Sequence, residues 1–178
     1  AEKAYKGVRK RCNAFPKAEV MIGNHDERVY RLAASVNIPA RFITGYELVW
    51  DTPKWKWKRD TEIDDVHYFH GTGCTGMQPA LNAAKGSGIS TVIGHVHSVA
   101  GVKWSCGPRQ RIFGMDVGCG VDISHPAMNY GKDARKKPIL AAGVVINGIP
   151  YHEIMPMARG EKYHKSKFKR KRKVTSHG

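Results

Sequence analysis

Short apolar runs alternate with amphipathic segments over the first half of the chain. We expect the apolar runs as strands at residues 18–22, 66–69 and 89–93, and the amphipathic segments as helices at residues 1–13, 28–36 and 78–85. In the second of these helices, apolar side chains recur at helical spacing at Val29, Leu32, Ala33 and Val36. Strands that alternate with helices in this way predict an α/β domain.

The second half of the chain is dominated by strand patterns. Strands are expected at residues 99–104 and 111–117, and a hairpin is expected to pair residues 139–146 with residues 149–154. Asn147-Gly148, between the last two runs, is the strongest two-residue signal for a hairpin turn. We therefore expect the α/β domain to finish in a second, antiparallel sheet.

Polar residues follow three of the predicted strands directly, at the point where each apolar run ends. These residues are Asn24-His25-Asp26, then His70, then His95 with His97. Ligands of open α/β sheets bind beyond the carboxyl ends of the strands, so we expect the three groups to converge. His95 and His97 are two positions apart and face the same side of an extended segment. Imidazole, amide oxygen and carboxylate together suit manganese, iron, zinc or nickel.

Each of these groups also has a structural interpretation. Asn and Asp after Gly23 are common in turns and at helix starts. A lone His in a strand, such as His67, is more often an ordinary surface or hydrogen-bonded residue. The joint occurrence at three strand ends favours a functional site.

The chain is strongly basic, with 178 residues, 30 Lys or Arg, 15 Asp or Glu, and a formal net charge of +15. No apolar run approaches the roughly 18 residues of a membrane helix, and residues 1–11 lack the apolar core of a secretory signal. Four scattered cysteines without a C-x-x-C pair argue against a zinc ribbon and a disulfide scaffold. This composition favours a reducing, cytoplasmic location.

Positive charge is concentrated at the carboxyl terminus. Residues 159–178 hold nine Lys or Arg and one acid, and we expect a disordered tail there, after a domain at residues 1–158. The densest part of the tail is Lys169, Arg170, Lys171 and Arg172. Three interpretations stay open: an arm that binds nucleic acid through its phosphates, a solubilising terminus, and a nuclear address.

Two further segments have weaker functional signals. Trp55 and Trp57 alternate with Lys, which is typical of a base-stacking platform for nucleic acid and equally of an edge strand, the interpretation we favour. The acids at residues 60–65 are expected in a solvated loop. Asp116, Cys119, Asp122 and Tyr130 lie in a segment expected to line the rim of the site.

Three motifs in this order resemble the signature of the calcineurin-like metallophosphoesterases. Gly23-Asn24-His25-Asp26, His70-Gly71 and Gly94-His95-Val96-His97 match its G-N-H-[DE], H and G-H-x-H elements. The resemblance covers residues 20–154 and is closest in style to the phosphoesterases of phage and bacterial genomes. It implies a four-layer αββα sandwich, and the cytoplasm of a bacterium or of a phage-infected host as the location.

The resemblance implies two divalent metal ions, of manganese, iron, zinc or nickel. Asn24, His70 and His95 would hold one ion, and His97 would be a ligand of the other. Two ions about 3.5 to 4 Å apart can clamp a phosphoryl group and activate a water molecule for hydrolysis of a phosphate ester.

The same resemblance gives the catalytic roles. His25 would face the scissile phosphate and stabilise or protonate the leaving oxygen, with Asp26 orienting its imidazole. The basic surface favours phosphodiesters of nucleic acid or nucleotides as the substrate.

Two elements of the signature, D-x-H and G-D-x-x-D, have no match upstream of Gly23. Their acids would supply most ligands of the first metal, so we expect a missing N-terminal segment or a partner chain to bring them. Two alternatives to a phosphodiesterase follow. One is a non-catalytic nucleic-acid-binding or degenerate phosphoesterase module, and the other is a phosphoprotein phosphatase.

Overall fold

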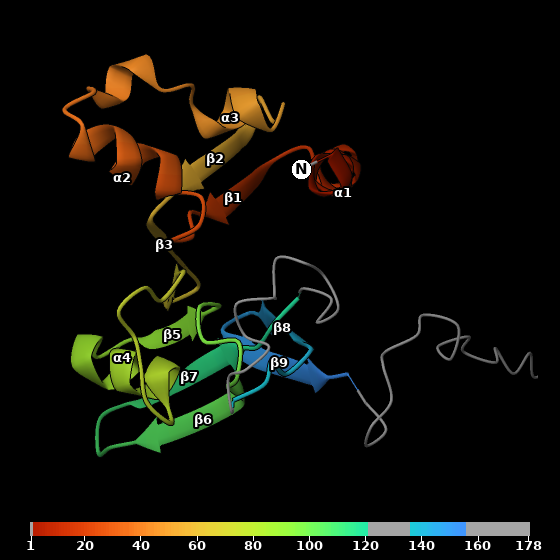
Figure 1. Cartoon of the computed structure of the whole chain (residues 1–178). Coiled ribbons are helices and arrows are strands. Elements are labelled where there is room, and N and C mark those ends of the chain that lie inside the picture. The colour runs from red at the N-terminus through yellow and green to blue at the C-terminus, as the bar shows by residue number, and fades with distance from the viewer. Residues whose placement is uncertain (1, 121–135, 156–178) are drawn as a thin grey trace, which may run out of the picture.

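The chain folds into two lobes, which a computed structural model describes for residues 2–120 and 136–155 (Figure 1). The N-terminal lobe contains α1 (Glu2–Ala14), β1 (Ala18–Met21), α2 (Arg28–Ser35), the 3-10 helix η1 (Ala40–Phe42), α3 (Tyr46–Val49) and β2 (Trp55–Lys58). The C-terminal lobe contains β3 (Asp60–Ile63), β4 (Val66–Phe69), α4 (Pro79–Ser87), β5 (Ser90–Ile93), β6 (Ala100–Cys106), β7 (Arg111–Val117), β8 (Ala141–Ile146) and β9 (Ile149–Ile154).

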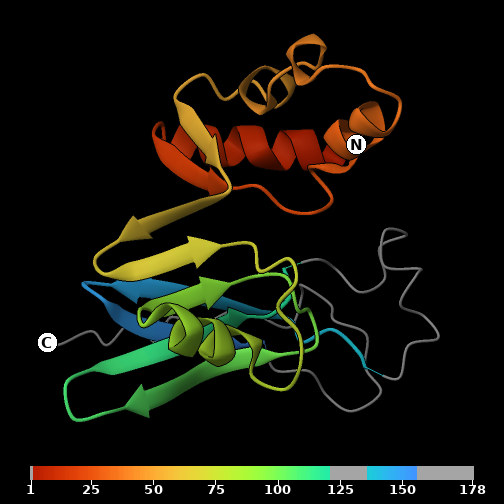
Figure 2. The ribbon, with the colours of Figure 1, turned by 90° about the vertical axis from the view of Figure 1, so that its left-hand side faces the viewer.

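The N-terminal lobe is built on a two-stranded parallel sheet. Strands β1 and β2 pair in the register Ala18 with Trp55 through Met21 with Lys58. Aromatic rings pack beside this sheet in a row, in which Trp57 stacks between Tyr46 at 5.4 Å and Trp50 at 6.4 Å between ring centroids. Arg59 alone separates β2 from β3, so the two lobes are joined by one nearly continuous strand (Figure 2).

The C-terminal lobe is built on a five-stranded sheet in the order β3-β4-β5-β7-β6. The three central strands β4, β5 and β7 run parallel, and the two edge strands run antiparallel to their neighbours. All four residues of β5 are buried, as expected for a central parallel strand.

This sheet is covered on both faces. Gly114 of β7 faces α4, because a Cβ at Gly114 would lie 2.1 Å from the backbone nitrogen of Leu81. Met115 of the same strand faces the β8–β9 hairpin, where a Cβ at Gly143 would lie 2.8 Å from its sulfur. Successive residues of a strand point to opposite faces, so α4 and the hairpin form layers on either side of the sheet.

The architecture agrees with the sequence-based expectation at the level of a mixed α/β fold. The predicted strands at 66–69 and 111–117 match β4 and β7, and Asn147-Gly148 forms the hairpin turn with φ of 51° and 73°. Gly88, in a left-handed conformation, ends α4, whereas Gly86 lies within the helix. The four-layer sandwich stays a prediction.

The acidic segment at residues 60–65 is a β-hairpin rather than the loop we expected. Asp60–Ile63 form edge strand β3, and Asp64 and Asp65 turn the chain into β4 with φ of 53° and 57°. An edge strand can keep its side chains in water, so its acids need not break the strand.

Asp116 and Cys119 lie in the interior, which makes the expectation of a place on the rim wrong. Asp116 is 4% exposed, and its Oδ2 accepts a hydrogen bond from Ala80 N at 3.4 Å at the start of α4. Its Oδ1 has no hydrogen-bond partner among the described residues. Burial raises the pKa of Asp116 to about 6. Cys119 is 2% exposed and packs against Leu140.

Some sequence-based expectations fall outside the described residues. The predicted domain boundary at residue 158, the basic tail at residues 159–178, and Asp122 and Tyr130 of the expected rim lie in the part that the structure does not describe. Among the described helices, none combines the length and hydropathy that crossing a bilayer requires.

Replacing Asp116 by Asn is expected to stabilise the protein at high pH more than at low pH. The raised pKa means that the folded chain binds a proton more tightly than the unfolded chain, so stability falls as pH rises from about 4 to 6. Asn keeps the shape without the charge. The stability gained by Asp116→Asn should therefore grow by about 2 to 3 kcal/mol between pH 4 and pH 8.

Urea unfolding at the two pH values measures this gain. Glu62→Gln, at an exposed acid on β3, is the control and should show no such growth. An equal effect of Asp116→Asn at both pH values would contradict the assignment of a buried, proton-binding carboxyl.

Candidate metal and phosphate site

Three side chains from both lobes meet at the junction of the two lobes. Asn24 Oδ1 lies 2.8 Å from His70 Nε2, and His70 Nε2 lies 3.1 Å from His95 Nδ1. The two imidazole rings are nearly perpendicular, at 71° with 4.9 Å between centroids. These residues follow β1, β4 and β5, so the convergence expected at the strand ends is present for one residue of each group.

The turn after β1 holds Asn24 in place. Gly23 N donates a hydrogen bond to Asp26 Oδ2 at 2.9 Å, and Arg31 of α2 donates from Nη2 to the Asn24 carbonyl at 2.8 Å. A Cβ at Gly23 would lie 3.2 Å from His70 Cε1. Glycine at position 23 therefore lets the backbone approach the imidazole closely.

The chain after β4 and β5 holds the two imidazoles. Gly94 N donates to the His70 carbonyl at 3.1 Å, which fixes the ends of the parallel strands against each other. Gly71 has φ of 96°, and a Cβ there would lie 2.9 Å from Ile93 Cβ and 3.3 Å from His95 Cβ. This position combines a left-handed backbone with a tight fit, and both favour glycine.

Burial and neighbouring imidazoles lower the pKa of His70 and of His97. The pKa of His70 is lowered mainly by desolvation and then by His95, with Asp26 acting in the opposite direction. The pKa of His97 is lowered by desolvation and then by His95 and His25. A neutral imidazole has a lone pair for a metal ion or a hydrogen-bond donor, so the shifts favour ligand binding near neutral pH.

The two donor distances at His70 Nε2 are those of hydrogen bonds and are also compatible with donors to one metal ion. Two donors at about 2.1 Å from an ion and at about 90° to each other lie about 3.0 Å apart. The two distances at His70 Nε2, 2.8 and 3.1 Å, are close to this value. An amide oxygen with two imidazoles also suits first-row transition metals.

The donor set is incomplete within the described residues. Over residues 2–120 and 136–155, no group of three or more His, Cys, Asp or Glu side chains is arranged to hold a metal ion. Beside the imidazoles of His70 and His95, the third donor is the amide of Asn24, which carries no charge. A divalent cation here would need carboxylates from elsewhere.

His25 and His97 lie near the three converging donors. His25 is exposed and close enough to His70 and His97 to lower the pKa of both. The carbonyl of His97 accepts a hydrogen bond from Ile139 N at 2.8 Å. The roles of His25 as a proton donor and of His97 as a second-metal ligand stay predictions.

Asp26 has a defined structural role. Its Oδ2 closes the turn at Gly23, which is the turn chemistry that the sequence also suggested. Its predicted role in orienting His25 stays a prediction.

The Trp-Lys segment has its tryptophans engaged within the N-terminal lobe. Trp57 lies between two rings, and its indole nitrogen donates to Thr52 Oγ1 at 3.1 Å. The Trp55 indole donates to the Phe15 carbonyl at 2.8 Å. These contacts favour the structural interpretation of β2 over a base-stacking platform. The other predicted nucleic-acid contacts, Lys169, Arg170, Lys171 and Arg172, lie outside the described residues.

Sequence reasoning missed Arg31. This cation lies seven residues after Asn24, on the exposed side of α2, and binds the Asn24 carbonyl. Its guanidinium lies beside the turn that carries Asn24. The signal in the sequence was an Arg on the helix that follows the Gly23–Asp26 motif. Two helical turns after Asn24, this position lies again on the side of the motif.

Comparison with known proteins gives no family. No protein-family model matches the chain, and no curated protein matches it.

The space around the glycines after His70 gives a test of the packing beneath the site. Gly71 and Gly73 both have positive φ, at 96° and 90°, but only Gly71 has neighbours close to the position of a Cβ. Gly71→Ala should therefore destabilise the protein by about 1 to 3 kcal/mol more than Gly73→Ala. Both substitutions strain the backbone, and only Gly71→Ala also overpacks the interior. Urea unfolding measures the difference, and equal losses would contradict this packing.

Proposed function

We propose that this chain contributes to a metal-dependent phosphoesterase that hydrolyses phosphate esters, with phosphodiesters of nucleic acid or nucleotides as the substrate class. The observation that carries the proposal is the convergence of Asn24, His70 and His95 from two lobes, at a donor spacing that is compatible with a metal ion. The layers of α4, the five-stranded sheet and the β8–β9 hairpin would form part of a four-layer αββα scaffold.

The described residues divide the work as follows. Asn24, His70 and His95 would hold one metal ion, and His97 would serve a second, adjacent ion. A bound divalent metal supplies Lewis acidity, which neutralises phosphate charge and makes water nucleophilic at neutral pH. His25, exposed at the mouth of the site, would donate a proton to the leaving oxygen. Arg31 would attract the phosphate electrostatically.

The remaining ligands would come from outside the described residues. The described donors are neutral, whereas carboxylates are what offset the charge of divalent metals in such sites. Either a segment preceding Ala1 or a partner chain would supply them.

Metal binding tests the proposed donors. Titration with Mn²⁺ or Zn²⁺ in a calorimeter, of the chain together with whatever segment or partner supplies the remaining ligands, should show binding that His95→Ala weakens by at least about 10-fold. His67→Ala is the matched control, because His67 lies on β4, three residues before His70, and should leave the affinity unchanged. Equal affinity in the His95→Ala variant would contradict the site.

Turnover tests the reaction. The complete protein should hydrolyse bis-p-nitrophenyl phosphate only with a divalent metal, and His97→Ala should lower kcat/KM by about 100-fold. Activity confined to phosphopeptides would favour a phosphoprotein phosphatase instead. Absence of metal-dependent turnover, with no effect of His97→Ala, would overturn the proposal.

The rival function is binding of nucleic acid without catalysis. The chain has 30 basic and 15 acidic residues, and this positive charge favours binding of nucleic acid. The lack of a carboxylate among the described donors also favours this rival function. It predicts DNA binding that falls by about 10³-fold between 50 and 200 mM salt and is lost on deletion of residues 159–178. Fluorescence anisotropy with a labelled duplex measures this. Salt-independent binding would exclude the rival, and strong salt dependence without turnover under any metal would favour it.

A further inference from the structure

A pocket lies at the end of the five-stranded sheet that is opposite the candidate metal site. Strands β4, β5 and β7 run parallel and begin at this end, whereas His70 and His95 follow the last residues of β4 and β5. The pocket has a volume of about 320 Å³, which is near the lower end of the range for small-molecule sites. Its walls include the β3–β4 turn, the β8–β9 turn and the end of α4. The space is sufficient for one small molecule.

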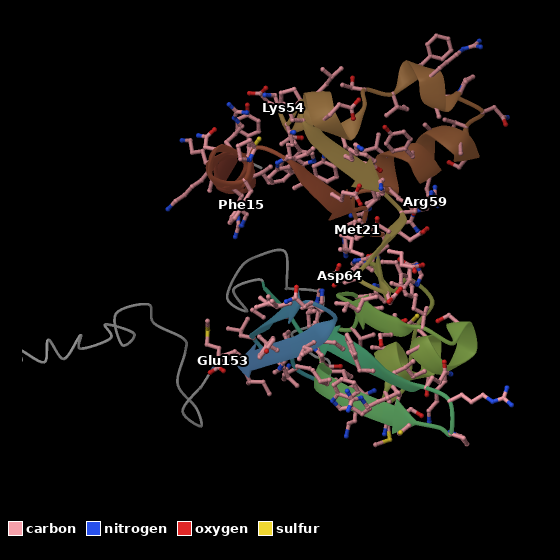
Figure 3. All side chains as sticks on the ribbon, turned by 180° about the vertical axis from the view of Figure 1, so that it is seen from behind. Phe15, Met21, Lys54, Arg59, Asp64 and Glu153 are labelled. Carbon is pink, nitrogen blue, oxygen red and sulfur yellow. The ribbon has the colours of Figure 1, made fainter. Side chains whose placement is uncertain are left out.

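Two tight hairpin turns form rigid walls of this pocket. Asp64 and Asp65 make the two-residue turn between β3 and β4, and Asn147 and Gly148 make the one between β8 and β9, all with positive φ. The turns are in contact, since a Cβ at Gly148 would lie 3.4 Å from the Asp64 carbonyl oxygen. Figure 2 shows both turns at the same end of the C-terminal lobe, and Figure 3 labels Asp64. The acidic side chains are therefore held on a well-defined backbone.

Charges of opposite sign line the pocket without pairing with each other. Asp64 and Asp65 come from the β3–β4 turn, and Arg111 is the first residue of β7. Among the residues that the structure describes, Arg111 has no ion pair with an acid, and neither Asp64 nor Asp65 has one with a base. The Arg111 guanidinium lies over the Trp104 ring instead, 5.1 Å from its centroid. A pocket lined by separated charges of both signs is complementary to a ligand that also carries both.

A serine hydroxyl adds a donor beside the guanidinium. Ser90, which also lines the pocket at the start of β5, is 9% exposed, and its Oγ accepts a hydrogen bond from Phe113 N at 3.2 Å. Within the described residues no group accepts the hydrogen of this hydroxyl. Arg111 and Ser90 can therefore donate to a carboxylate, and the two aspartates can accept from an ammonium group, which has three hydrogens to donate.

The balance of charges favours a basic amino acid as the ligand. Two carboxylates and one guanidinium line the pocket, so they complement two positive charges and one negative charge. Lysine carries this set at neutral pH, with an α-ammonium, an ε-ammonium and one carboxylate. Its alkyl chain separates the ε-ammonium from the carboxylate, which suits a pocket whose own opposite charges lie too far apart to pair.

We propose that this pocket binds a free basic amino acid, with the ligand carboxylate at Arg111 and Ser90 and its ammonium groups at Asp64 and Asp65. The proposal does not depend on the proposed phosphoesterase function, since the two sites lie at opposite ends of the same strands. The three charged side chains are exposed, and exposed ion pairs are weak, so we expect a dissociation constant of about 1 mM.

Titration of the ¹⁵N-labelled complete protein with L-lysine, followed by NMR, tests the pocket. Amide resonances of residues 64–66, 88–90 and 148 should shift and saturate, while those of residues 24, 70 and 95 should not shift. L-Lysinamide lacks the carboxylate and L-norleucine lacks the ε-ammonium, so each should bind at least about 3- to 5-fold more weakly than lysine. Nα-Acetyl-lysine mimics the last residue of a peptide. If it bound as tightly as lysine, the assignment to a free amino acid would be wrong.

Matched variants locate the contacts. Asp65→Asn removes a charge and keeps the turn, because Asn tolerates positive φ, and it should weaken lysine binding about 3- to 5-fold. Arg111→Gln should weaken binding of lysine by a similar factor but leave binding of lysinamide unchanged, a difference that a mere loss of structure would not produce. Glu62→Gln and Arg109→Gln make the same charge changes at exposed residues outside the pocket and should leave both affinities unchanged.

Three results would overturn the proposal. One is the lack of a saturable shift at lysine concentrations up to ~50 mM, far above the expected dissociation constant. Another is equal weakening by the pocket variants and their matched controls. The third is binding of lysinamide as tight as that of lysine, because the guanidinium would then have no carboxylate to bind.

Discussion

The contact between Asn24 and His70 links the two lobes at the candidate site. Asn24 stands at the end of a small parallel sheet, and His70 stands at the end of the central sheet of the other lobe. His95 extends the contact by one further hydrogen-bonding distance, from the neighbouring parallel strand. The candidate site is therefore a product of how the lobes meet, and neither lobe contains it alone.

The two lobes differ in how firmly they hold their halves of the site. His70 and His95 leave adjacent parallel strands above a closely packed core, with Gly71 pressed against Ile93. Asn24 is held by a turn, a guanidinium and the edge of a thin sheet. Rigid support on one side and weak support on the other make the N-terminal lobe the part whose order decides whether the donors converge.

The sequence predicted the convergence better than the details around it. Topology alone required the residues after parallel strands to lie at one edge, and Asn24, His70 and His95 do so. Apolar runs also located β4 and β7, of which β7 is buried on both faces and β4 only at Val66. These features depend on local patterns that tertiary packing reinforces.

What the sequence did not predict depends on packing between distant elements. Strand β3 is acidic and lies at the edge of its sheet. A short acidic segment is also typical of a loop, so the sequence did not distinguish the two. Asp116 was expected at the rim of the site. Only the position of α4 shows that its carboxyl is enclosed. The exposure of Val29, Leu32 and Val36 could not be predicted either. Helical spacing predicts an apolar stripe on the helix, but it does not say which element covers that stripe.

The two lobes are joined at Arg59 by a single strand, and the flexibility of this joint affects how tightly the site holds a ligand. Arg59 is exposed and pairs with Glu27 at 2.8 Å, and next to it Thr61 of β3 donates to the Glu19 carboxylate of β1, so surface interactions of modest strength hold this joint. Rotation about this point would move Asn24 away from His70 and His95 together. A ligand held by both sides binds the closed arrangement alone, so its affinity contains the free energy of closing the lobes. Substitutions at the joint, far from any donor, would then change how tightly the ligand is held without changing a single contact to it.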